Sequence, residues 1–209
     1  MSTARRSFLG RLAALLAVGA TPRSLAAAIP VAPEAGAPDE RWLNAIAQRE
    51  QRILIETGII QDALAFRRAL NFMDVYNQDF ATPDERLGVA VGVHSPALAM
   101  ILNDAMWSKY AFGTRFSVNN AQGQPATASP FAAGGPATVE GLRRRGVEVL
   151  ACNRSLTRLG RDLAGPGGNA QGTHAELVAN VVPGVIVVPA MIVAVSRSTV
   201  RGVPYVAVA

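Results

Sequence analysis

Cysteine and lysine are almost missing from this sequence of 209 residues, in which each occurs once, as Cys152 and Lys109. A single cysteine excludes an intramolecular disulfide framework and the Cys-x-x-Cys pairs of dithiol redox proteins. The two histidines, His94 and His174, are far from the cysteine in sequence, so no metal-binding spacing is present and we expect no metal. The phosphate-binding glycine fingerprints and the Gly-x-Ser-x-Gly elbow of hydrolases are also missing, so we expect no nucleotide cofactor.

Excess charge of one sign is scarce once the N-terminal segment is set aside. Of the 20 basic residues, 19 are arginine, and the formal net charge is +5. Four arginines lie within the first 28 residues, and without them 16 basic residues face 15 acidic ones. A chain with so little net charge lacks the clustered positive field that neutralises phosphates, so we expect no nucleic-acid partner.

Residues 1–28 have the pattern of an export signal. The pair Arg5-Arg6 precedes Ser7-Phe8-Leu9, an apolar stretch follows over 8–20, and small residues at 26–28 offer a cleavage site. The paired arginines resemble a twin-arginine signal and predict a periplasmic protein, with an ordinary secretory signal as the alternative. Residues 29–40 are predicted to be a flexible linker, followed by one domain over 41–209. The apolar run over 181–195 is interrupted by prolines and a glycine, so we expect no membrane span in the mature chain.

The domain alternates between strand-like and helix-like segments. Strands are predicted at 52–56, 87–93, 147–151, 185–188 and 205–208, and helices at 41–48, 61–76, 97–110, 137–145, 154–159, 174–180 and 190–201. This alternation implies right-handed crossovers, and therefore a three-layer α/β/α fold with a five-stranded, mainly parallel sheet. Residues 113–136 break the alternation and are predicted to be a long loop insertion, either functional or disordered.

Reactive side chains follow two of the predicted strands, at the sheet edge where ligands of parallel sheets gather. Cys152 follows the third strand, and His94 with Ser95 follows the second. Asn153 is a candidate cap for the helix after Cys152, and Arg154 lies in its first turn. The helix start and the arginine both favour a thiolate at Cys152, which would make it reactive. The alternatives are that Cys152 is a small buried apolar side chain and that His94 caps the following helix.

The remaining charged groups are placed by the same topology. Arg143-Arg144-Arg145 end a helix just before a strand, which predicts a solvated position at the sheet edge opposite Cys152. Arg158 is predicted on the same edge as Cys152. His174 follows a glycine-rich turn and is expected to be solvated.

Several of these segments resemble the DsrE/DsrF-like family of sulfur-relay proteins. The segments are Gly146–Leu156 around Cys152, Val182–Pro189, Arg201–Val206, Val91–Pro96 and Ala69–Phe72. Their order and spacing extend the resemblance over about residues 50–208. It implies a small α/β/α domain, usually oligomeric, with members that hold sulfur as a persulfide on a cysteine and pass it to a partner. Cys152 is the matching cysteine.

Two hypotheses follow, and they differ in the role of Cys152. In the first, the protein is a sulfur carrier or sulfurtransferase: Cys152 accepts sulfane sulfur, Asn153, Arg154 and Ser95 hold the anion, and His94 handles protons. Its partners would be a second copy of the chain and a sulfur donor or acceptor, either a protein or a small sulfur anion. In the second, the protein is a non-catalytic oligomeric binding module with a buried structural cysteine. A weaker third idea makes 113–136 the contact surface of an interaction protein.

Overall fold

Five strands form one sheet in which every neighbouring pair is parallel. The computed structural model describes residues 39–208. Its strands are β1 (Gln51–Thr57), β2 (Leu87–Val93), β3 (Glu148–Cys152), β4 (Ile186–Val188) and β5 (Tyr205–Val208). They lie in the order β4-β3-β2-β1-β5, so β4 and β5 are the edges. The predicted sheet is confirmed, and it is parallel throughout.

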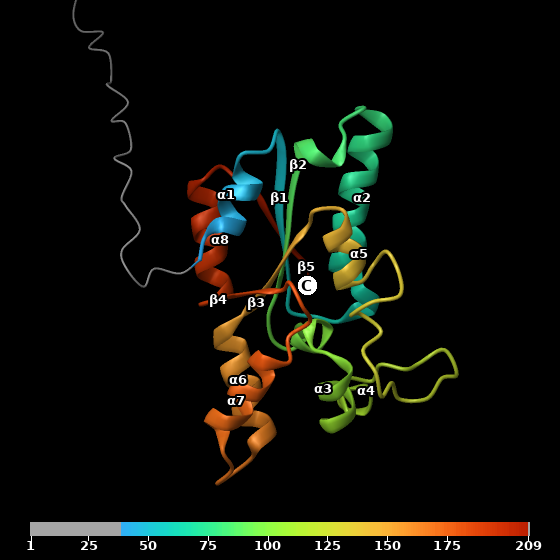
Figure 1. Ribbon diagram of the computed structural model, residues 1–209, viewed down its shortest axis with the longest axis vertical. Coiled ribbons are helices and arrows are strands. Elements are labelled where there is room, and N and C mark those ends of the chain that lie inside the picture. The colour runs from blue at the N-terminus through green and yellow to red at the C-terminus, as the bar shows by residue number, and fades with distance from the viewer. Residues whose placement is uncertain (1–38, 209) are drawn as a thin grey trace, which may run out of the picture. The chain divides into compact units, whose positions relative to one another are not determined.

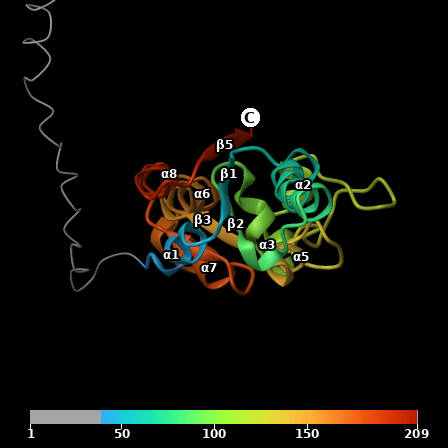
Figure 2. The same cartoon turned by 90° about the horizontal axis from the view of Figure 1, so that it is seen from above.

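Helices cover both faces of this sheet and complete the predicted three layers. Figure 1 shows α2 (Leu64–Asp79) and α5 (Val139–Arg144) on one side, and α1 (Arg41–Ala47) and α8 (Met191–Val200) on the other. The view from above separates the same two groups of helices across the strands (Figure 2). The direction of the crossovers explains the division. The connections from β1 to β2 and from β2 to β3, which contain α2 and α5, cross the sheet in one direction. The connection from β4 to β5, which contains α8, crosses it in the opposite direction. Because all of these connections are right-handed, opposite directions place their helices on opposite faces.

β2 is the most buried strand, because it lies at the centre of the sheet. All seven of its residues are buried, as its continuous apolar sequence predicts for a strand covered on both faces. Val89 and Val91 join the core under α2 and α5, whereas Ala90 joins the core under α1 and α8. Alternate residues of one strand therefore belong to two separate cores.

The segment 97–110, predicted to be one helix, is two. A 3₁₀ helix, η3 (Ala97–Ile101), is followed by α3 (Asp104–Lys109), with Leu102 extended between them and bridged to Val181. Asn103 causes the new start, because its side chain accepts a hydrogen bond from the backbone N–H of Met106. The predicted helix 61–76 likewise begins with a 3₁₀ turn, η1 (Gln61–Ala63), before α2. A third 3₁₀ turn, η2 (Asp84–Arg86), leads into β2.

The prediction that the helix after Cys152 covers only 154–159 is wrong, because Gly160 does not end it. The helix α6 (Asn153–Ala164) continues past it and ends before Gly165, which has a positive φ of 68°. Gly160 instead allows close packing against α7 (Ala170–Ala179), because a Cβ there would lie 2.9 Å from the backbone nitrogen of His174. In Figure 1 the α6–α7 hairpin extends away from the carboxyl end of β3.

None of the helices in residues 39–208 has the length and apolar character that a membrane span requires.

The predicted loop insertion at 113–136 is anchored at two points. It begins inside a short helix, α4 (Phe112–Arg115), and then forms no further helix or ladder beyond an isolated bridge from Asn119 to Pro125. Ala126 and Phe131 are buried, and the Phe131 ring lies 5.8 Å from the Trp107 ring, centroid to centroid. The predicted signal (1–28) and nearly all of the predicted linker (29–40) lie outside the described residues.

Arg145 corrects the prediction that the arginines at 143–145 form a solvated face. Its side chain is three-quarters buried, and its guanidinium donates hydrogen bonds to Asp84, Asp74 and Asn77, with 2.8 Å from Nε to Asp84 Oδ2. The Arg145 hydrogen bond holds the pKa of the Asp84 carboxyl below its ordinary value. Arg144 is more than half exposed and pairs with Glu140, as a solvated residue would.

Replacing Arg145 with methionine is expected to lower the free energy of unfolding at neutral pH by about 2 kcal/mol. The pKa of Asp84 is lower in the folded chain than in the unfolded one, so its contribution is present above its unfolded pKa and is lost as the pH falls through its folded pKa. The difference in unfolding free energy between wild type and variant should therefore become smaller below about pH 4. Urea unfolding at pH 7 and pH 3 measures it, with Arg144→Met as the exposed control. A gap that does not change with pH would contradict this account.

Candidate functional site

Cys152 lies where three elements meet, at the carboxyl end of β3. It is the last residue of β3, is paired in register with Val188 of β4, and is the residue from which α6 begins. Its side chain points to the face covered by α1 and α8 and packs in the core there with Leu150, Val188 and Met191. The residue is only 4% exposed. The sequence placed Cys152 correctly at the sheet edge, and of the two surroundings it allowed, the structure has the buried one.

The sulfur of Cys152 accepts one hydrogen bond, from the start of α8. The backbone N–H of Met191, the first residue of α8, donates to Sγ at 3.3 Å. The start of α6 is tied to the same place, because the backbone N–H of Arg154 donates to the carbonyl of Pro189 at 3.3 Å. Two helix N-termini therefore lie beside Cys152, and only that of α8 donates to its sulfur. The partial positive charge at a helix start favours an anion there.

The side chain of Met191 fills a hollow left by Gly92 of β2. A Cβ at Gly92 would lie 2.4 Å from Met191 Sδ, so the thioether takes the space of the missing side chain. Met191 is itself only 4% exposed. The same residue therefore supplies the N–H group to Sγ and covers the neighbouring strand. Sequence reasoning missed Met191, because the residue becomes relevant only when the start of α8 is placed over β3.

His94 directly follows β2, the strand beside β3, and the alternation along β2 would place it on the same face as Cys152. Val93 and Ala151 are register partners, so His94 and Cys152 are the next residues along each strand. The His94 side chain is one-third exposed, and its Nε2 lies 3.9 Å from Glu56 Oε2, a carboxylate at the end of β1. No hydrogen bond between His94 and Cys152 occurs in the described residues. Glu56 was missed by sequence reasoning, although the alternation along β1 would place it on this face.

Asn153 and His174 form a pair that the sequence did not predict. Asn153 is the first residue of α6, one position inside the expected cap, and Cys152 holds the cap position. The Asn153 side-chain oxygen accepts from His174 Nε2 at 2.8 Å. His174 is therefore half-buried and holds the start of α6, which corrects the expectation of a solvated residue.

The other predicted site residues lie at this edge without closing on the sulfur. Ser95 is half-buried and follows His94, ahead of a cis peptide bond to Pro96. The Arg154 and Arg158 side chains are exposed. In residues 39–208 no group of three or more histidine, cysteine, aspartate or glutamate side chains could hold a metal ion. The arrangement can polarise and shield one sulfur atom, with a histidine–carboxylate pair on the same face.

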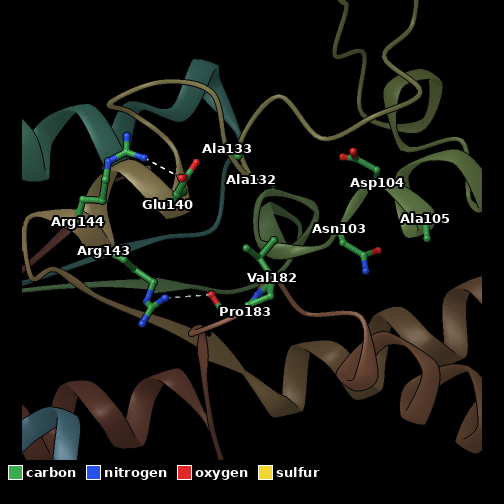
Figure 3. A pocket seen from close by; sticks show the side chains of 10 residues that line it. All are labelled: Asn103, Asp104, Ala105, Ala132, Ala133, Glu140, Arg143, Arg144, Val182 and Pro183. Carbon is green, nitrogen blue, oxygen red and sulfur yellow. Dashed lines mark hydrogen bonds and ion pairs between the residues drawn. The ribbon is translucent and has the colours of Figure 1, made fainter.

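A cleft of about 670 Å³ lies away from this sulfur, on the α5 side of the molecule. It is bounded by the start of α3, by α5, by Ala132 and Ala133 of the loop insertion, and by Val182 and Pro183 before β4 (Figure 3). Figure 3 also shows that both arginines of the cleft are paired locally, because Arg144 pairs with Glu140 and Arg143 donates to the Pro183 carbonyl. Neither Cys152 nor His94 lines this cleft.

No protein-family model matches the chain, and no curated protein is significantly similar to it.

Proposed function

We propose that this protein is an exported sulfur carrier of the DsrE/DsrF-like kind, which holds sulfane sulfur on Cys152 as a persulfide. The observation that carries the proposal is the hydrogen bond from the Met191 N–H to Cys152 Sγ. A cysteine that only fills space in a core needs no donor. A thiolate or persulfide anion is stabilised by a backbone N–H at a helix start, because hydrogen bonds to charged groups are stronger than those between neutral groups.

The reaction requires no oxidant. With thiosulfate as donor, the Cys152 thiolate attacks the outer sulfur, the new S–S bond forms, and the old S–S bond breaks with sulfite as the leaving group. With polysulfide, the leaving group is a polysulfide shorter by one sulfur. The product in both cases is the Cys152 persulfide anion, and attack by an acceptor thiolate on its outer sulfur regenerates the Cys152 thiolate.

His94 and Glu56 are suited to the protons of this cycle. The thiol must lose a proton before it attacks, and His94 is the titratable side chain that follows the neighbouring strand on the same face. Glu56 lies 3.9 Å from the far nitrogen of His94, where a carboxylate favours one orientation of the ring. Arg154, in the first turn of α6, adds positive charge for an incoming sulfur anion.

Burial sets the condition for loading. Because Cys152 is 4% exposed, a sulfur donor reaches Sγ only when one of the side chains packed around Cys152 moves aside. The Met191 side chain is suited to that movement, since methionine is unbranched and adapts to several rotamers. Between loading events the same side chains would shield the persulfide from water and stray thiols.

Export and self-association complete the proposal. Residues 1–28 supply the twin-arginine-type signal and the periplasmic location. Ile192 and Val200 of α8 and Tyr205 and Val206 of β5 are exposed, and such apolar side chains are suited to a contact between copies of the chain.

The test is sulfur loading of the native protein. After incubation with thiosulfate or polysulfide, the intact mass should increase by one sulfur atom, and a reductant should remove the increase. Cys152→Ser should show no increase. A gain that persists in Cys152→Ser, or no gain in wild type whose thiol has been reduced beforehand and freed of reductant, would contradict the proposal.

The second candidate function is a binding module in which Cys152 is structural, and the burial of Cys152 among apolar side chains favours it. Thiol labelling separates the two candidates. A carrier should react with a small alkylating reagent in its native state, because the side chains packed around Cys152 must move aside. A structural thiol should react only after unfolding.

A further inference from the structure

The arginines of α6 differ from most other basic side chains of residues 39–208 in having no hydrogen-bond or ion-pair partner within that range. Residues 39–208 contain 16 basic side chains. Most of them donate to a carboxylate or a backbone carbonyl, as Arg86 does to Glu50 and Arg197 to Glu40. The basic side chains of this range for which no hydrogen bond or ion pair is found are Arg68, Arg115, Arg154, Arg158 and Arg161. Three of these five belong to one helix of 12 residues.

Helical spacing gathers these three side chains on one face, which we call the arginine stripe (Arg154, Arg158, Arg161). At 3.6 residues per turn, positions 154, 158 and 161 lie within about 60° of one another around the axis and extend over about 10 Å. All three are exposed. The opposite face of α6 is buried through Leu156, Leu159 and Gly160. Asp162 is the acidic residue of this helix, and no ion pair joins it to the stripe.

The stripe begins at the end of α6 that follows Cys152. Arg154 is two residues from Cys152, and its backbone is bonded to Pro189, just before α8. At the start of α8, Ile192 is 76% exposed and directly follows the residue that donates to Sγ. The α6–α7 hairpin extends away from the carboxyl end of β3, so a second molecule can approach α6 (Figure 1).

We propose that the arginine stripe is a docking surface for an acidic segment of another protein. The identification of that protein as the one that exchanges sulfur with Cys152 rests on the proposed function. The three charges are unpaired within residues 39–208, and carboxylates of a partner would pair them. The stripe suits a short acidic segment better than a nucleic acid or a membrane surface. Those partners require a broad positive field, whereas residues 39–208 carry only 16 basic against 14 acidic residues.

The test is binding of a short fluorescent peptide of repeated Glu-Glu-Leu units to the full chain, measured by anisotropy at low ionic strength. Arg158→Glu/Arg161→Glu should weaken binding at least about tenfold, because like charges then face the peptide. The matched control is Arg68→Glu/Arg115→Glu, which removes two equally unpaired, exposed arginines and changes the net charge by the same amount. The control should bind within about twofold of wild type. If the glutamate variant unfolds by circular dichroism, Arg158→Gln/Arg161→Gln replaces it.

Equal losses in the two double variants would overturn the proposal, since binding would then follow net charge alone. Preferential binding to phosphatidylglycerol vesicles or to single-stranded DNA, lost in the α6 variant, would also overturn it. Cys152→Ser should bind the peptide as wild type does. If that variant binds while wild type fails to load sulfur, the docking surface stands and the proposed function fails.

Discussion

Proline in place of Met191 is expected to slow sulfur loading of Cys152 by about tenfold or more, relative to alanine at the same position. Proline removes the N–H that donates to Sγ, whereas alanine keeps it. Both variants remove the thioether from the hollow over Gly92. Their difference therefore isolates the hydrogen bond, for which about 1.5–3 kcal/mol is typical when one partner is charged.

The local backbone accepts proline at this position. Met191 is the first residue of α8, where the N–H has no partner within the helix. Ala190 is extended, with φ −156° and ψ 143°, which suits a residue that precedes proline. Loading is followed by intact mass over time at pH 7, and thermal unfolding verifies that the two variants are equally folded. Equal loading rates would show that the N–H does not act on the sulfur.

Alanine at Gly88 is expected to destabilise the whole domain by about 2 kcal/mol or more. A Cβ there would lie 2.3 Å from the carbonyl oxygen of Ile46 and 2.9 Å from its Cα. These are backbone atoms at the end of α1, so no side-chain rotation relieves the overlap. The helix must move away from β2, which loosens the core formed by Trp42, Leu43 and Leu54.

Gly135→Ala is the matched control for this prediction. A Cβ at Gly135 would have only Thr138 Cγ2 nearby, at 3.9 Å, in ordinary contact. The melting temperature should fall by about 5 °C or more in Gly88→Ala and stay nearly unchanged in Gly135→Ala. If the two variants melted together, the close approach of α1 to β2 would not be a source of stability.

The sequence was sufficient for the sheet because each strand carries its own local signal. The run 87–93 is apolar at every position that is not glycine, and β2 occupies those same residues. The two glycines of β2 were read only as part of the apolar run. Their actual role, to let α1 approach at Gly88 and Met191 at Gly92, depends on helices distant in sequence.

The two helix errors have different origins. Gly160 is a plausible local stop, yet packing against His174 needs a glycine inside the helix. Asn103 starts a new helix within a segment whose apolar periodicity continues on both sides. Tertiary packing overrides the local stop signal at Gly160, whereas at Asn103 a local side-chain cap interrupts the apolar periodicity.

The sequence predicts at which edge of the sheet the candidate site lies, but not how its side chains are oriented or paired. Strand ends in a parallel sheet share one edge, so Cys152, His94 and Ser95 could be brought together from sequence alone. The direction in which the Cys152 side chain points depends on the parity of β3, and its donor comes from a helix 39 residues later. The pairs Glu56–His94 and Asn153–His174 join separate elements, so no short motif reveals them.

Cyanide release of sulfur tests the central claim most directly. Cyanide removes the outer sulfur of a persulfide as thiocyanate and leaves the thiolate. Native protein that has been loaded with polysulfide and freed of excess reagent should yield about one thiocyanate per chain, and Cys152→Ala treated in the same way should yield none. Equal yields from the two proteins, or no thiocyanate from wild type, would contradict the claim that this chain holds sulfur on Cys152.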